Sequence, residues 1–191
     1  PGVGVVSVGV NISGDLAHPG DVILLSGCIG DHGIAVLSKR ENLEFETTIE
    51  SDSAALHELV SAMVKAVPQI HCLRDPTRGG LATVCHELLH STQMGIRIRP
   101  VDIPIKDTVQ SVCDMLGYDP LFLACEGRVV AIVDPDQAQH VLDKWKALPG
   151  GFDAAIVGDI DSGLSHVVLQ TGLGGERILE ELEDDPLPRI C

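Results

Sequence analysis

Aromatic residues are scarce in this sequence: three Phe, one Tyr and one Trp make up 3% of its 191 residues. With so few large rings, the hydrophobic core has to be built mainly from Val, Leu, Ile and Ala. The other proportions, with 45% hydrophobic residues, 20 Gly and 11 Pro, are those of an ordinary globular protein. The length suits one domain, or one domain with a tail.

Positive charge is also scarce, since 13 Lys and Arg stand against 28 Asp and Glu, giving a formal charge of -15. A surface for nucleic acid or for an anionic membrane needs the opposite sign, which excludes both partners. No apolar run approaches the roughly 20 residues of a membrane-spanning helix, and no signal-peptide pattern opens the sequence. We therefore expect a soluble, cytoplasmic protein.

Cysteine pairs of the CxxC type are missing, although the sequence has six cysteines. Without an export signal, five of them are expected to be reduced and buried as small hydrophobic side chains. These five are Cys28, Cys72, Cys85, Cys113 and Cys125. The sixth, Cys191, is the last residue and needs a different explanation.

The sequence divides into three parts. It opens at Pro1 in an apolar run without Met, so we interpret residues 1–20 as the end of a missing N-terminal domain or a linker. Residues 21–175 are predicted to form one α+β domain, a mixed or antiparallel sheet covered by helices. A short acidic helix and a flexible, extended tail are predicted for residues 176–191.

Hydrophobic periodicity places the individual elements of the predicted domain. Strands are expected at residues 22–26, 95–105 and 128–134, and a hairpin at 154–157 and 166–169. Helices are expected to follow the glycine-rich turn at 30–33 and to cover residues 56–67, 81–88, 109–116, 135–148 and 176–182. Residues 51–53 are expected to cap the helix at 56–67.

The tail has features of a projecting arm. Pro186 and Pro188 disfavour helix and hold the chain extended, and three acidic residues at 183–185 keep its base solvated. A stiff arm that ends in the thiol of Cys191 could present this thiol to another active site. The alternative is an incidental terminal cysteine without a role.

A second candidate site is the segment LRDPTRGG at residues 73–80, which leads into a predicted helix. Gly79 and Gly80 at a helix start leave backbone N–H groups open to an anion, and the helix dipole favours negative charge there. Asp75 could hold Mg²⁺, while Arg74 and Arg78 could neutralise phosphate oxygens. An ordinary Asp–Arg ion pair at a turn is the alternative.

A third candidate is HELLH at residues 86–90, which matches the HExxH pattern of zinc hydrolases. In these enzymes two histidines bind the metal and the glutamate activates water, roles that would fall to His86, His90 and Glu87. At 100° per residue, however, both histidines are predicted to point away from the apolar face of the helix. Two histidines on a solvated helix face are therefore the alternative.

Four segments resemble one family. The terminus DPLPRIC at 185–191 resembles the PRIC terminus of the HypE hydrogenase-maturation family. Residues 26–33 (SGCIGDHG), 74–80 and 116–128 (LGYDPLFLACEGR) are similar to the same family in the same order. This family belongs to the aminoimidazole ribonucleotide synthetase-like, or PurM-like, superfamily.

The resemblance implies an ATP-dependent carbamoyl dehydratase. HypF would place a carbamoyl group on Cys191, and ATP with Mg²⁺ would drive its dehydration to a thiocyanate. The cyano group would pass to the HypC–HypD complex and become a cyanide ligand of a nickel–iron hydrogenase. The resemblance also implies a homodimer whose N-terminal domain supplies most of the nucleotide site.

Within this reaction Glu126, beside Gly127 and just before a predicted strand, is our candidate for the base. Its alternative role is an ion pair with Arg128 or a cap of the turn. A different kind of function also stays open, in which the chain by itself is only a catalytically silent carrier and docking module.

Overall fold

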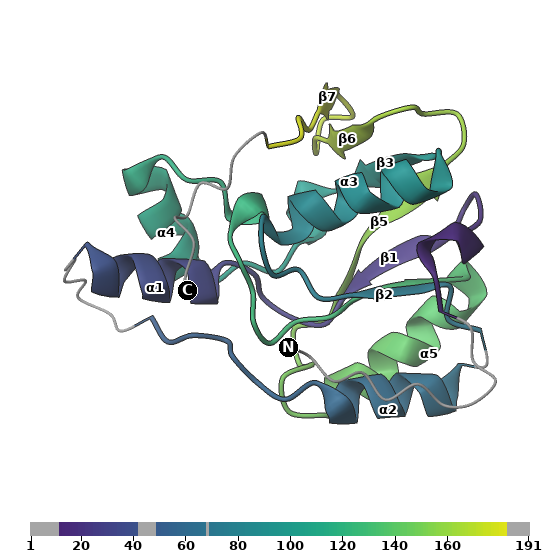
Figure 1. Ribbon diagram of the computed structural model, residues 1–191, viewed down its shortest axis with the longest axis horizontal. Helices are drawn as coiled ribbons and strands as arrows, with labels where there is room; N and C mark the ends of the chain where they lie inside the picture. The colour runs from purple at the N-terminus through teal and green to yellow at the C-terminus, as the bar shows by residue number, and fades with distance from the viewer. Residues whose placement is uncertain (1–11, 42–48, 68, 183–191) are drawn as a thin grey trace.

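The computed structural model describes residues 12–41, 49–67 and 69–182. Its centre is one seven-stranded sheet with helices on both faces (Figure 1), which confirms the predicted α+β class. Neighbouring strands run antiparallel, except for the parallel pair β3 and β6. Across the sheet the strands lie in the order β2-β4-β1-β5-β3-β6-β7. In chain order they are β1 Val22–Leu25, β2 Cys72–Arg74, β3 Gly95–Ile98, β4 Val130–Val133, β5 Ala155–Asp161, β6 Val167–Gln170 and β7 Glu176–Ile178.

Five α-helices and three short 3-10 helices complete the described part of the chain. Most predicted helices are confirmed, including the one that Pro135 opens and the one that Gly117 ends in a left-handed conformation. The helices are α1 Asp31–Arg40, α2 His57–Ala66, α3 Gly80–Thr92, α4 Asp107–Leu116, α5 Pro135–Lys146, η1 Gly14–Leu16, η2 Pro100–Asp102 and η3 Pro120–Phe122.

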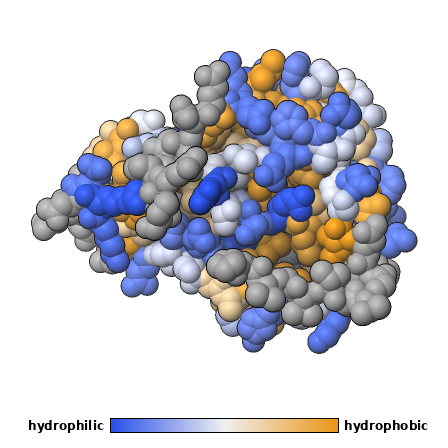
Figure 2. Space-filling model, viewed as in Figure 1, coloured by the Kyte–Doolittle hydropathy of each residue, from blue (hydrophilic) through white to orange (hydrophobic). Residues whose placement is uncertain are grey.

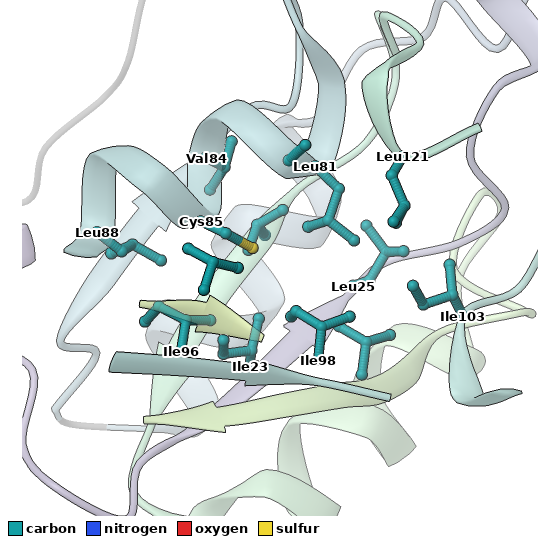
Figure 3. Packing of buried hydrophobic residues seen from close by; sticks show 14 of the residues in the cluster. Ile23, Leu25, Leu81, Val84, Cys85, Leu88, Ile96, Ile98, Ile103 and Leu121 are labelled. Carbon is teal, nitrogen blue, oxygen red and sulfur yellow. The ribbon is translucent and has the colours of Figure 1, made fainter. Parts of the chain in front are cut away.

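The central strand β1 is apolar throughout because both faces of the sheet are covered. Ile23 and Leu25 face the cluster under α3, and Leu24 faces the cluster shared with α2 and α5. Figure 3 shows Leu81, Val84, Cys85 and Leu88 of α3 over the isoleucines of the sheet. As expected, aliphatic side chains make up most of this core.

The second layer contains the single tryptophan of the chain. Trp145 in α5 is fully buried, and its indole N–H donates to the carbonyl oxygen of Leu59 in α2 at 3.1 Å. A smaller apolar cluster joins α1 to α4. Figure 2 shows strongly hydrophilic side chains over α1, at the left of this view. In the described part of the chain, every helix is too short or too polar to cross a membrane.

The predicted hairpin of residues 154–157 and 166–169 is wrong. β3 lies between β5 and β6, and it pairs with β5 in antiparallel and with β6 in parallel orientation. The two strands of a hairpin must pair with each other, and here β3 occupies the position between them. The segment that follows β5 crosses the end of β3 before β6 begins.

The acidic helix predicted for residues 176–182 is also wrong, because Glu176–Ile178 forms the edge strand β7. A glycine-rich turn, with Gly174 at φ 82°, brings this strand back onto β6. The Glu176 carboxylate then accepts a hydrogen bond from Arg97 of β3 at 3.2 Å. Strand pairing and this ion pair outweigh the helix propensity of the segment.

Candidate functional site

Three segments that resemble HypE lie side by side in the fold. The backbone N–H of Gly33 donates to Ala124 O at 3.1 Å, and that of Cys125 donates to Pro76 O at 2.9 Å. The Arg128 guanidinium donates to Cys28 O at 2.7 Å. Segments 26–33, 74–80 and 116–128, far apart in the sequence, therefore converge on one site.

The 75–80 loop leads into the N-terminus of α3, as predicted, and it follows strand β2, which was not predicted. Asp75 and Arg78 are exposed, and neither forms an ion pair with another residue that the structure describes. Arg74 instead pairs with Glu87 of α3, 3.4 Å away. The alternative interpretation of this turn, an Asp–Arg ion pair, is therefore wrong for the described residues.

Gly79 and Gly80 both have left-handed backbones, with φ of 67° and 61°. A Cβ on Gly80 would lie 2.5 Å from Leu121 O, so this glycine lets α3 pack closely against η3. The Gly80 N–H donates to Thr77 O at 3.1 Å and is not available to a ligand. Of the two predicted N–H donors, Gly79 remains for an anion.

Glu126 lies on the surface next to this loop. Its backbone N–H donates to Asp52 Oδ1 at 3.0 Å, while its carboxylate has no hydrogen-bond or ion-pair partner in the described ranges. A Cβ on Gly127 would lie 1.8 Å from Asp52 O, so only glycine permits this contact. The neighbouring backbone is therefore fixed while the Glu126 side chain is left available.

Arg128 lies near Asp31 and Asp52 and does not pair with Glu126, so the alternative of an ion pair between Arg128 and Glu126 is wrong. The Arg128 guanidinium lies 3.5 Å from Asp52 Oδ2 and 3.8 Å from Asp31 Oδ2. Lys106 Nζ forms an ion pair with Asp31 Oδ1 at 3.0 Å. Both oxygens of Asp31 and Oδ2 of Asp52 are buried without a hydrogen-bond partner among the described residues.

Opposing effects act on the pKa of Asp31 in this buried cluster. Burial raises the pKa of Asp31, and the charges of Lys106 and Arg128 oppose that rise. Removing one partner of such a buried pair would leave the other charge uncompensated.

Asp52 was not predicted as a site residue, because residues 51–53 were expected to cap a helix. In fact α2 begins after Leu56, without a side-chain cap.

The five internal cysteines are buried free thiols, as predicted. Burial raises the pKa of Cys28 and Cys113 to about 11 and of Cys85 and Cys125 to about 12, and it also raises that of Cys72. The reactive thiolate is thus suppressed at neutral pH. Cys191 lies outside the described residues.

We therefore expect a thiol reagent to label one cysteine rapidly in the native protein, and all six after denaturation. Peptide mapping after brief alkylation would identify the labelled residue, which we predict to be Cys191. Rapid labelling of Cys28 or Cys125 would contradict the burial that the structure shows for them.

The HExxH pattern does not form a metal centre here. His86 is buried, contrary to the prediction, because the backbone of residues 179–180 covers it, and burial lowers its pKa. His90 is exposed and lies 3.0 Å from Glu181. Among the described residues no group with the geometry of a metal site contains either histidine. The zinc-hydrolase interpretation is therefore not supported.

Comparisons with known proteins identify the family of this chain. Residues 18–169 match the family model of the AIR synthase related protein, C-terminal domain. The carbamoyl dehydratase HypE of Azotobacter vinelandii is 48% identical over 191 residues, which are 100% of this chain and 56% of that protein. The chain thus spans about half the length of the curated relatives it matches.

Solved HypE structures have the same fold. In a HypE–HypF complex, a chain 42% identical superposes with a TM-score of 0.87, covering 90% of this chain and 56% of that one. HypE in complex with ATP is 41% identical with a TM-score of 0.86, covering 92% and 54%. This chain therefore belongs to the AIR synthase related protein family, whose C-terminal domain it contains, and over its whole length it is similar to HypE proteins.

Proposed function

We propose that this chain is the C-terminal part of an ATP-dependent carbamoyl dehydratase that matures nickel–iron hydrogenase in the cytoplasm. One observation carries the proposal: the hydrogen bond from Cys125 N–H to Pro76 O places the 75–80 loop beside Glu126. A candidate phosphate loop and a carboxylate with no partner among the described residues are thereby neighbours. The names of the similar proteins, carbamoyl dehydratase HypE and HypE in complex with ATP, support this reading.

In the proposed reaction the Cys191 sulfur holds the carbamoyl carbon throughout. ATP supplies a phosphoryl group that turns the carbamoyl oxygen into a leaving group, and Mg²⁺ offsets the phosphate charge. The carbamoyl nitrogen loses both protons and phosphate departs, which leaves a cyano group on sulfur. Glu126 is the proposed acceptor of a nitrogen proton, because its carboxylate is exposed and its backbone is anchored to Asp52.

The residues of the 75–80 loop fit the nucleotide side of this reaction. The exposed carboxylate of Asp75 is the proposed Mg²⁺ ligand, as a hard cation prefers oxygen. Arg78 and the Gly79 N–H would contact phosphate oxygens at the N-terminus of α3. Gly80 would act through packing, since its N–H is bonded to Thr77 O.

The partners belong to the same proposal. HypF is the proposed carbamoyl donor, and the similarity to a chain in a HypE–HypF complex supports it. The HypC–HypD complex is the proposed acceptor of the cyano group. We further propose that the full-length protein is a homodimer and that residues 176–191 include the arm that carries Cys191.

The test uses the full-length protein after carbamoylation by HypF. Adding ATP and Mg²⁺ is expected to remove the mass of one water from the peptide that contains Cys191, as seen by intact and peptide mass spectrometry. Without ATP the mass should stay unchanged. Loss of the whole carbamoyl group instead would mean hydrolysis, and the proposed dehydration would be wrong.

The 191-residue chain alone is expected to bind ATP weakly or not at all. It carries the 75–80 loop, but the resemblance assigns most of the nucleotide site to an N-terminal domain. Calorimetric titration of this chain with ATP and Mg²⁺, beside the full-length protein, checks the expectation. Micromolar affinity of the chain alone would show that residues 1–191 contain a complete site.

A further inference from the structure

A cluster of two histidines and one aspartate lies outside the proposed catalytic site. His18 and Asp21 belong to the turn before β1, and His71 immediately precedes β2. Asp21 and His71 are buried, whereas the His18 side chain is exposed. One nitrogen from each imidazole and one Asp21 oxygen all lie within 4.8 Å of one another. Among the described residues no other group has this geometry.

The backbone around the cluster is held firmly. Asp21 Oδ2 lies 2.6 Å from His71 Nδ1 and accepts a hydrogen bond from the His18 backbone N–H at 2.7 Å. Asp21 and Gly20 are also bonded through their backbones to Ile160 of β5. Two of the three side chains therefore stand in fixed positions, and His18 closes the cluster from the solvent side.

The two imidazole rings are spaced as rings on one metal ion would be. Their centroids are 4.9 Å apart and their planes cross at 80°. Nitrogens held 2.0–2.1 Å from a tetrahedral ion put such rings about 5 Å apart. The ligand atoms themselves would lie about 3.3 Å apart around that ion. Metal binding would therefore replace the 2.6 Å contact between Asp21 and His71 and reorient the exposed His18 side chain.

We propose that His18, Asp21 and His71 form a binding site for a divalent first-row transition metal such as Zn²⁺, with a fourth position open to water. Imidazole and carboxylate are ligands that this class of ion accepts. The site differs from the proposed Mg²⁺ contact at Asp75, because His71 precedes β2 and Asp75 follows its end. The inference does not depend on the dehydratase reaction.

The experiment titrates the metal-free, full-length protein with Zn²⁺ by calorimetry and with Co²⁺ by absorption spectroscopy. All proteins carry Cys191→Ala, so that the terminal thiol contributes no ligand. Compared with this parent, we expect the protein that also carries His18→Ala to bind one ion fewer, or to bind that ion at least tenfold more weakly. His140→Ala, which removes an exposed histidine of α5, is the matched control and should bind as before.

Asp21→Asn provides a second variant, and a thermal melt without metal checks that it folds. His18→Ala keeps the test decisive even if that variant unfolds, because the His18 side chain is exposed. Equal binding by the parent, His18→Ala and His140→Ala proteins would overturn the proposal. Absence of any binding by the parent protein would overturn it as well. A loss confined to His90→Ala would place the ion at the HExxH pattern instead.

Discussion

Replacing Glu126 with Gln in the full-length protein is expected to slow the ATP-dependent conversion of the carbamoyl group by about two orders of magnitude or more. Gln keeps the size and most hydrogen bonds of Glu but loses its affinity for a proton. The exposed Glu126 carboxylate has no partner in the described part of the chain, and the Asp52 contact uses only its backbone. Melting temperature and carbamoyl loading should therefore stay nearly unchanged.

A single-turnover mass-spectrometric assay on carbamoylated protein, run beside a thermal melt, measures both effects. Glu50→Gln is the matched control, because Glu50 is exposed and precedes the same 51–53 segment that contacts Glu126. It should convert at the parental rate. A Glu126→Gln protein with lower stability and a normal rate would assign this residue to folding and not to proton transfer.

Replacing Cys191 with Ala should abolish carbamoyl acceptance from HypF without lowering the melting temperature. The prediction rests on the PRIC terminus and on Pro186 and Pro188, which are predicted to keep the tail extended. No internal cysteine can substitute, since all five are buried and burial raises the pKa of each thiol. Intact mass after incubation with HypF, ATP and a carbamoyl donor provides the measurement.

The parent protein, which should gain one carbamoyl group, is the positive control for this assay. A Cys191→Ala protein that still gains the full mass would show that another residue is the acceptor. Peptide mapping would then find it, and the carrier role of the tail would be wrong.

The sequence predicted best those elements whose signals are local. The strand at Val22–Leu25 is a short apolar run between glycines, and α5 combines Pro135 at its start with a regular apolar stripe. Pairing between distant strands has no such signal. The parallel alignment of Ile96 with Val167 places β3 between β5 and β6, and no local feature of the sequence signals this, so a hairpin of β5 and β6 was wrongly predicted.

Side-chain environments set by distant residues were equally hard to predict. Helical periodicity correctly placed His86 off the apolar face of α3, but the segment around Leu179 covers that side of the helix. Asp52 lies in a polar stretch without regular structure, and only the fold brings it to Arg128 and Glu126. For the 75–80 loop, in contrast, the pair Gly79 and Gly80 gave a local signal for the turn into α3.

The position of β1 in the middle of the sheet has a consequence for the newly made chain. Val22 aligns with Val133 on one side and with Asp159 on the other, so β1 has no strand partner until most of the chain has been synthesised. At usual translation rates this interval lasts on the order of ten seconds. Four consecutive aliphatic residues stay open to non-native association during that time, and topologies with such distant pairings fold slowly. Assembly of this domain on the ribosome should therefore depend on chaperones that shield the N-terminal strand until β5 emerges.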